Sequence, residues 1–380
     1  MLRRGLLWGW LLVLLLAILA VAPLTYPGFF EVDSGFLSTF RAARPLETPA
    51  WTQPGDLLRG EGRLPYILAW PFLQISGSSI TAVKWGYGLA FLLGASGVYV
   101  WLRRRLGLRG AVLAATVYTY LPWHLATVYV RGAYAEAWLW AFWPFVLWAV
   151  DRLAERHLPG IVAALAVGLP ALIAAIWTQP GLAALFLPIA LAYAVVMGPN
   201  RRRTALRLAS TLAAIFVVLL VLAGTASAPP LPFDDHFLYP FQLLSAYWGY
   251  GPGPEGAPFQ LGLAAVGLGL VAVALGATGR RPRSADAPDW APSAFLTLGR
   301  SLVFWSVVLL LLVLLTLPLA APFWRLSRFQ SFLTYPWQVL ALAGLPLATL
   351  AGSVVRLDRR LRAFPAWAGL LALVVLASYF

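Results

Sequence analysis

The chain alternates long apolar runs with short clusters of arginine, and this alternation limits the folds open to it. An α-helix needs about 17 to 25 apolar residues to cross a bilayer. Eleven stretches meet this requirement, at 5–24, 78–102, 110–128, 133–150, 159–177, 179–197, 208–225, 259–276, 301–320, 334–352 and 364–380. Because 61% of the 380 residues are hydrophobic and only 11% are charged, the sequence predicts an all-α protein that crosses a membrane many times.

The arginine clusters predict which loops face the cytoplasm. They lie at 3–4, 103–109, 152–156, 201–207, 280–300 and 356–362. If Arg3 is cytoplasmic and the eleven spans alternate, every cluster falls on the cytoplasmic side, as the positive-inside rule requires. The prediction is a multi-pass protein of the inner membrane with a cytoplasmic N-terminus. Topology then accounts for the net charge of +14, and no basic face indicates a nucleic-acid partner.

The loops predict one transmembrane helical domain over residues 1–380, with its unusual chemistry on the outer side. Two outer loops are long, at about 25–63 and 226–258, and an inner loop at about 277–297 has the composition of a flexible linker. Directly after the first outer loop, the apolar segment 64–74 is short and contains proline, which is typical of an interfacial or re-entrant helix. The chain has no Cys, which excludes disulfides and Cys-ligated metals.

Glu31 and Asp33 follow directly after the first apolar run, in the stretch FFEVDSGF. At the membrane surface, such a carboxylate can deprotonate an acceptor hydroxyl or bind a divalent cation. The alternative is that Asp33 and Ser34 cap a short helix in SGFLSTFRAARPLE, since both are favourable N-cap residues. The sequence is compatible with both a catalytic and a capping role.

A second group of candidates lies in YVRGAYAEA, at 129–137, between two predicted spans. Arg131 is a bidentate donor suited to phosphate, and Glu136 falls in the first turn of the next helix, where its charge favours the positive end of the dipole. The alternative is a hairpin turn with an interfacial arginine and an ordinary first-turn acid. His124 precedes this turn among aromatic residues, as a candidate substrate contact or, more simply, a packed histidine.

Two later segments complete the candidates on the predicted outer side. Asp234, Asp235 and His236 have the residue types of a weak metal or acid–base cluster, for which a divalent cation is the candidate cofactor. Arg325 and Arg328 lie three residues apart, which places them on one face of a helix. Such a pair suits a diphosphate or polyprenyl phosphate, or it contacts anionic headgroups.

Three stretches together resemble a known membrane family. They are YVRGAYAEA with the preceding LPWHL, FQLLSAYWGYG followed by FQLGL, and APFWRLSRFQSFLTYPWQVLALAG. The resemblance is to the bacterial family labelled 6-pyruvoyl-tetrahydropterin synthase-related, whose architecture is similar to that of GT-C glycosyltransferases. It implies a GT-C-like fold of about eleven spans, with short juxtamembrane helices in the first outer loop.

The same resemblance implies a transferase that uses a polyprenyl-phosphate-linked sugar, with Asp33 as the catalytic acid in the first outer loop and Glu31 as its neighbour. The expected partners are this lipid-linked sugar, membrane lipids and a protein of a membrane complex. Members of the family tend to carry a histidine shortly after the acid, whereas GFLSTFR contains none. This departure favours the alternative of a non-catalytic structural or assembly subunit, with a lipid flippase as a third hypothesis.

Overall fold

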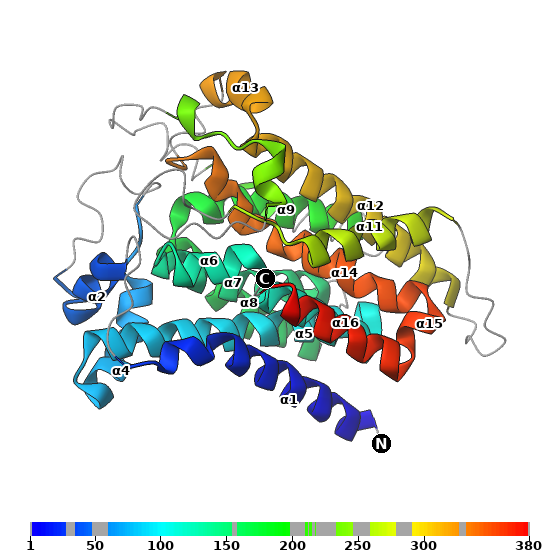
Figure 1. Ribbon diagram of the computed structural model, residues 1–380, viewed down its shortest axis with the longest axis horizontal. Coiled ribbons are helices and arrows are strands. Elements are labelled where there is room, and N and C mark those ends of the chain that lie inside the picture. Colours follow the sequence, from blue (N-terminus) through cyan, green and yellow to red (C-terminus); the bar gives the residue numbers. More distant parts are fainter. Residues whose placement is uncertain are drawn as a thin grey trace.

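The computed structural model is a bundle of helices that run between two ends of the molecule (Figure 1). It describes residues 2–27, 35–47, 60–153, 158–197, 233–245, 259–278, 291–326 and 332–378, with five further residues between 210 and 217. Over these ranges the regular structure is helical and contains no β-strand. The predicted all-α class is therefore confirmed for the described part of the chain.

The helices follow the apolar runs of the sequence closely. In the N-terminal half they are α1 (Leu2–Val21), η1 (Ala22–Thr25), α2 (Gly35–Ala43), α4 (Leu64–Ser76), α5 (Ser79–Thr119), α6 (Pro122–Tyr129), α7 (Tyr134–Leu153), α8 (Leu158–Thr178) and α9 (Pro180–Met197). In the C-terminal half they are η2 (Asp234–His236), η3 (Pro240–Leu243), α11 (Leu263–Ala277), α12 (Ala291–Thr316), η4 (Pro318–Ala320), α13 (Ala321–Leu326), η6 (Pro336–Leu342), α14 (Gly344–Leu357), α15 (Arg359–Arg362) and α16 (Phe364–Leu376).

Fewer helices than the predicted eleven are long and apolar enough to cross a membrane. Among the described residues five helices meet this test, or six when the bent pair η6 and α14 counts as one span. Helices α11 and α16 coincide with predicted spans but have only 15 and 13 residues, below the usual length for a crossing. The predicted span 208–225 falls almost wholly outside the described residues. The count of eleven is therefore not confirmed.

Helix α5 contains nearly all of the predicted span 78–102 and the first half of the span 110–128, and these two parts double back on each other. An aromatic carbon of Tyr118 lies 3.4 Å from the position of a β-carbon on Gly94, although a straight helix would separate residues 24 apart by about 36 Å. The reversal occurs at Gly107, where φ is 73° and ψ is 178°. Only glycine adopts this backbone region readily, so Gly107 decides where the hairpin turns.

We expect Gly107→Ala to lower the free energy of unfolding by about 1 to 3 kcal/mol, the usual cost of forcing a side chain into this backbone region. No atom lies within 4 Å of the added methyl group, so the whole effect comes from the backbone. Gly88→Ala is the matched control, because Gly88 lies in the same helix, also in open space, with ordinary helical geometry. Thermal unfolding in detergent should show loss of stability for the first variant and none for the second.

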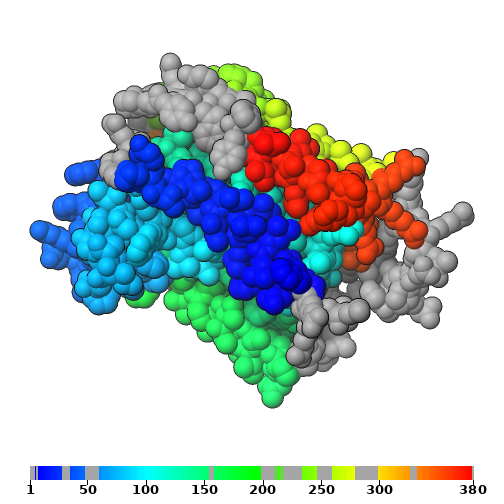
Figure 2. Space-filling view, turned by 60° about the horizontal axis from the view of Figure 1, so that its bottom comes forward, coloured from blue at the N-terminus to red at the C-terminus, as the bar shows by residue number. Residues whose placement is uncertain are grey.

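The apolar surface of the bundle is distributed as in a membrane protein. Large apolar side chains are exposed along its outer helices, among them Leu15 at 53%, Leu165 at 52% and Leu310 at 58%. Helix α1 crosses the face seen in Figure 2, with α4 on one side and α16 on the other. The buried core is formed mainly by alanine, leucine and valine, together with many tryptophan and tyrosine rings, which pack the helices against one another.

The two ends of the bundle differ in chemistry. At one end, which we call the arginine-rich end, lie residues 103–109 and 356–362; at the other, the α2 end, lie α2 and α4 (Figure 1). Helix α1 runs from one end to the other. Near its start, a β-carbon on Gly9 would touch Leu108 at the arginine-rich end. Shortly after the helix, the carbonyl of Tyr26 accepts a hydrogen bond at the α2 end.

A half-buried ion pair connects three helices at the arginine-rich end. The Nη2 atom of Arg105 lies 2.6 Å from Oδ1 of Asp151, and its Nε atom lies 3.1 Å from Oδ2. The hydroxyl of Tyr193 lies 3.0 Å from both carboxylate oxygens and accepts a hydrogen bond from the indole of Trp101. Because every charge here has a partner, this network joins α5, α7 and α9.

Candidate functional site

Helix α2 brings the first outer loop against the bundle. The predicted catalytic residues Glu31 and Asp33 lie outside the described residues, but α2 begins two positions after Asp33. Its buried positions are Gly35, Ser38 and Ala42, which are small enough for a close approach to α4 and α5. The hydroxyl of Ser38 donates a hydrogen bond of 3.2 Å to the carbonyl of Gly132, in the turn between α6 and α7.

An ion pair secures the other end of α2. The Nη1 atom of Arg41 lies 2.7 Å from Oε2 of Glu61, which also accepts a hydrogen bond of 2.5 Å from the hydroxyl of Tyr66. Burial and the neighbouring carboxylate raise the pKa of Tyr66 well above its ordinary value, so the phenol keeps its proton and acts as a donor. Glu61 therefore joins the segment before α4 to α2.

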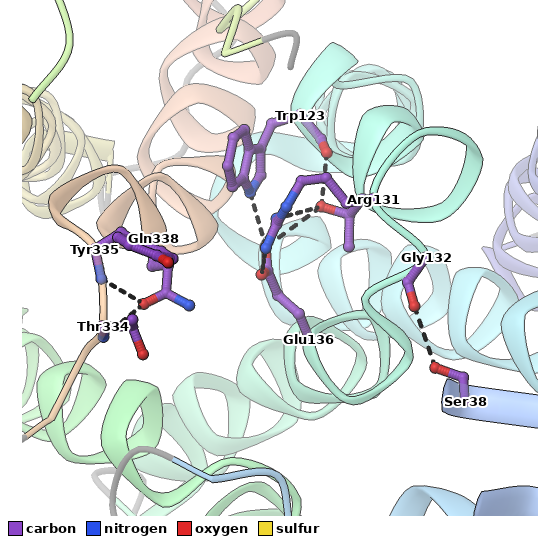
Figure 3. A network of polar contacts seen from close by, with 9 residues as sticks. Ser38, Trp123, Arg131, Gly132, Glu136, Thr334, Tyr335 and Gln338 are labelled. Atoms are coloured by element: carbon purple, nitrogen blue, oxygen red, sulfur yellow. Dashed lines mark hydrogen bonds and ion pairs between the residues drawn. The ribbon is translucent and has the colours of Figure 1, made fainter. Parts of the chain in front are cut away.

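A second ion pair holds the turn between α6 and α7 (Figure 3). Arg131 and Glu136 form a bidentate pair, with Nη2 to Oε2 at 2.9 Å and Nη1 to Oε1 at 3.0 Å. The Oε1 atom also accepts hydrogen bonds from the indole of Trp123 at 3.0 Å and from Thr127 at 3.3 Å. The side chain of Glu136 is only 2% exposed and that of Arg131 is 11% exposed, so the pair is almost fully removed from solvent.

Two aromatic rings lie beside the Arg131 guanidinium. Its Cζ atom lies 4.8 Å from the ring centre of Trp123 and 4.7 Å from that of Trp337. The ring of Trp337 stacks on Tyr335, and Tyr335 in turn contacts His236. Such cation–π contacts strengthen when the cation is desolvated. Arg131 is thus held by one carboxylate and by two neighbouring indoles.

The environment of Arg131 and Glu136 decides what this pair can do. Glu136 lies in the first turn of α7, as the sequence predicted, but it is buried and paired rather than solvated. The two nitrogens that would grip a phosphate already bind Glu136. Displacing that carboxylate would leave it buried without its counter-ion, which is costly. These contacts favour a role in positioning the turn over direct phosphate binding.

The structure packs His124 into the helix core. Its ring stacks on Trp140 with centres 4.1 Å apart, and its Nδ1 atom lies 2.6 Å from the carbonyl of Tyr118. The side chain is 0% exposed, and a β-carbon on Gly344 would lie only 2.9 Å from the ring. This geometry fits the packed histidine that the sequence offered as the simpler interpretation, and it gives a substrate no access to the ring.

Arg325 pairs with Asp234, and the two side chains are 63% and 53% exposed. The distance from Nη2 to Oδ1 is 2.6 Å, and the contact joins α13 to η2. The structure thus brings together two of the predicted site residues from segments about 90 positions apart in sequence. Arg328 lies outside the described residues.

The metal-site hypothesis gains no support from the described residues. Within them, no group of three His, Asp or Glu side chains is placed to hold an ion. Asp234 and Asp235 lie in the short helix η2 together with His236, whose ring contacts Tyr335, and Asp234 has a guanidinium as its partner. A divalent cation at this position stays a prediction.

Several residues of this end were not among the sequence candidates. Ser38, Arg41 and Glu61 make the contacts that hold α2, and Trp123 and Trp337 enclose Arg131. In the sequence, Glu61 is one acid among several in a long loop, and the two tryptophans lie more than 200 positions apart. Only their meeting in space distinguishes them from ordinary interfacial residues.

Comparison with protein-family models shows which family the chain belongs to. The model for the 6-pyruvoyl-tetrahydropterin synthase related domain, described as a membrane protein, matches residues 62–251, which is half of the chain. The chain belongs to this family. No curated protein sequence matches it. The match to the 6-pyruvoyl-tetrahydropterin synthase related family confirms the resemblance that the sequence indicated. The stretches YVRGAYAEA and FQLLSAYWGYG both lie in the matched range.

Two solved membrane structures resemble this family member in fold. Arabinofuranosyltransferase AftD from Mycobacteria superposes with a TM-score of 0.54 at 16% identity, covering 99% of this chain and 26% of its own. The oligosaccharyltransferase of Archaeoglobus fulgidus, solved with zinc and sulfate, superposes with a TM-score of 0.55 at 16% identity, covering 98% of this chain and 52% of its own. The chain thus spans about a quarter and a half of these proteins, and the likeness confirms the expected GT-C-like fold.

Proposed function

We propose that this chain is a membrane glycosyltransferase of GT-C type, which transfers a sugar from a polyprenyl-phosphate donor to an acceptor hydroxyl at the outer membrane face. The fold supports this, because nearly the whole chain superposes on two proteins named for transferring sugars. The chemistry at the α2 end supports it as well, since both acidic and basic side chains gather there with polar partners.

The observation that carries the proposal is the attachment of α2 to the bundle. Ser38 binds the carbonyl of Gly132, and Arg41 binds Glu61, so α2 is held at both ends against the helices. Because α2 begins two residues after Asp33, its attachment places the start of the helix beside the turn that carries Arg131. A catalytic carboxylate needs such a rigid support to meet its substrate in a productive geometry.

In the proposed reaction, Asp33 acts as the general base and Glu31 as its neighbour. Asp33 takes the proton of the acceptor hydroxyl while the acceptor oxygen attacks the anomeric carbon of the donor sugar. The bond from that carbon to the phosphate oxygen breaks with its electron pair, and polyprenyl phosphate leaves. The sugar is transferred with inversion, and the base returns its proton to solvent.

Arg325 and Arg328 are the groups that we assign to the departing phosphate. The pair between Arg325 and Asp234 is exposed, and surface pairs contribute about 1 kcal/mol or less, so a phosphate can replace the carboxylate. Both terminal nitrogens of Arg131 already bind Glu136, so we assign Arg131 to holding the turn. Asp234 and Asp235 stay candidates for a divalent cation that accompanies the phosphate.

A direct assay tests the proposal. The purified chain, reconstituted in liposomes, is given a polyprenyl-phosphate donor with a radiolabelled sugar, and the release of polyprenyl phosphate is followed over time. We expect release to depend on the protein and to rise when acceptor glycans are added. An intact donor at every acceptor concentration, with folded protein, contradicts a transferase.

The second candidate function is a non-catalytic subunit that keeps the same scaffold. One observation favours it: within the described part of the α2 end, Arg41 pairs with Glu61 and Arg131 pairs with Glu136, so these charges stabilise structure. Under this hypothesis the donor stays intact in the liposome assay. Substituting Asp33 would then leave the protein's stability and its recovery in a membrane complex unchanged.

A further inference from the structure

Five arginines gather at one corner of the arginine-rich end, where α5, α14, α15 and α16 meet. This arginine corner consists of Arg109, Arg356, Arg359, Arg360 and Arg362. Helix α15, seen at one extreme of the molecule in Figure 1, carries three of them. The corner is at the opposite end of the bundle from α2 (Figure 1).

Most of these guanidinium groups lack a carboxylate partner. Among the described residues, no ion pair is formed by the side chains of Arg109, Arg356, Arg360 and Arg362. The side chain of Arg109 donates a hydrogen bond to the main-chain carbonyl of Arg362. The side chain of Arg356 donates one to the main-chain carbonyl of Arg105. Asp358, which lies within the corner, accepts a hydrogen bond of 2.7 Å from the main-chain N of Arg360 and caps α15. The nearby Asp151 is already bound to Arg105.

Two contacts make the corner a prepared site rather than a solvated run of charge. The indole of Trp367 donates a hydrogen bond of 3.0 Å to the carbonyl of Arg109, and its ring lies 5.9 Å from the Arg109 guanidinium. Together with the bond from Arg356 to the carbonyl of Arg105, at 2.7 Å, these contacts fix two cations in place before any ligand arrives. Binding then costs less side-chain entropy.

The surroundings of the corner indicate the kind of anion. Phe364 follows α15 directly and is 63% exposed, and Leu108, next to Arg109, is 40% exposed. Exposed apolar side chains on this bundle face lipid tails. A ligand with a negative group and an apolar chain can contact the arginines with the first and Phe364 and Leu108 with the second. Basic pockets between membrane helices bind the anionic headgroups of lipids.

We propose that the arginine corner binds the phosphodiester headgroup of an anionic membrane phospholipid. The headgroup lies among Arg109, Arg360 and Arg362, and the acyl chains follow the exposed surface of Phe364 and Leu108. This site is independent of the proposed sugar transfer, because it uses no residue of the α2 end. Its role is to anchor the C-terminal helices α14 to α16 to the bilayer.

Native mass spectrometry of the purified chain with phosphatidylglycerol tests the proposal. Each arginine near a membrane anion contributes about fivefold to binding, so the double variant Arg360→Gln with Arg362→Gln should bind this lipid roughly 30-fold more weakly. Both side chains are exposed, which keeps the fold intact. Replacing the same two residues with lysine retains the charge and should retain most of the affinity.

The matched control is Arg44→Gln, an exposed arginine at the α2 end whose pair with Glu47 is on the surface; its phosphatidylglycerol affinity should equal that of the unaltered chain. Equal binding by the double glutamine variant overturns the proposal. So does equal binding of zwitterionic phosphatidylcholine, which would mean that only the apolar surface matters. Displacement of the lipid by millimolar inorganic phosphate would mean that free phosphate is the ligand, and it overturns the proposal as well.

Discussion

Replacing Asp33 with Asn is expected to lower the rate of sugar transfer by about 100- to 10,000-fold, the usual contribution of a general base. Asparagine keeps the size and hydrogen-bonding shape of the side chain but cannot take the acceptor proton. The assay is the release of polyprenyl phosphate from a radiolabelled donor in liposomes. Because the acceptor proton is taken up during bond formation, the loss should appear in the turnover rate more than in the donor concentration needed for half-maximal rate.

A control in the same outer loop separates loss of the base from loss of charge. Glu47→Gln also removes one negative charge, but Glu47 is exposed and its partner is the equally exposed Arg44. We expect its turnover to match that of the unaltered chain. If the Asp33→Asn and Glu47→Gln variants have the same activity, Asp33 is not the base.

The second large effect is on stability, and it concerns the pair between Arg131 and Glu136. We expect Glu136→Gln to lower the free energy of unfolding by about 3 to 5 kcal/mol, because it leaves Arg131 as an uncompensated buried charge. The amide still accepts hydrogen bonds from Trp123 and Thr127, so the packing changes little. Unfolding of the detergent-solubilised protein, followed by tryptophan fluorescence, measures the difference.

A double-mutant cycle shows whether charge is the cause. When Arg131→Gln is combined with Glu136→Gln, no unpaired charge remains, and the double variant should be more stable than Glu136→Gln alone. Glu47→Gln again serves as control, since its exposed pair contributes about 1 kcal/mol or less. Additive losses in the cycle, or a loss below about 1 kcal/mol for Glu136→Gln, would show that the pair is not a buried structural ion pair.

The sequence predicted much of the α2 end but not its chemistry. It placed Glu136 in the first turn of a helix and Arg131 in the preceding turn, and both positions are confirmed. The sequence indicated Arg131 as a phosphate ligand, because a guanidinium in a loop can donate two hydrogen bonds to a phosphate. Whether its nitrogens are free depends on Glu136, Trp123 and Trp337, which lie in three different helices and meet beside it.

The hairpin of α5 shows the same division on the scale of a helix. The arginines at 103–109 marked a boundary between two apolar runs, and the structure turns there. The turn occurs at Gly107 because its backbone geometry is open to glycine and strained for other residues. Helix lengths were less predictable, since α11 and α16 are shorter than the apolar runs around them.

The sequence by itself determined the class of this protein, because apolar runs of about 20 residues have the length of membrane-spanning helices, which satisfy their own backbone polar groups. It also determined the family, through stretches that keep their order along the chain. The tertiary structure alone decided which charges pair with one another. Glu61 neutralises Arg41 and Glu136 neutralises Arg131, because an ion pair depends on a distance of a few ångströms, which the order of residues along the chain does not give.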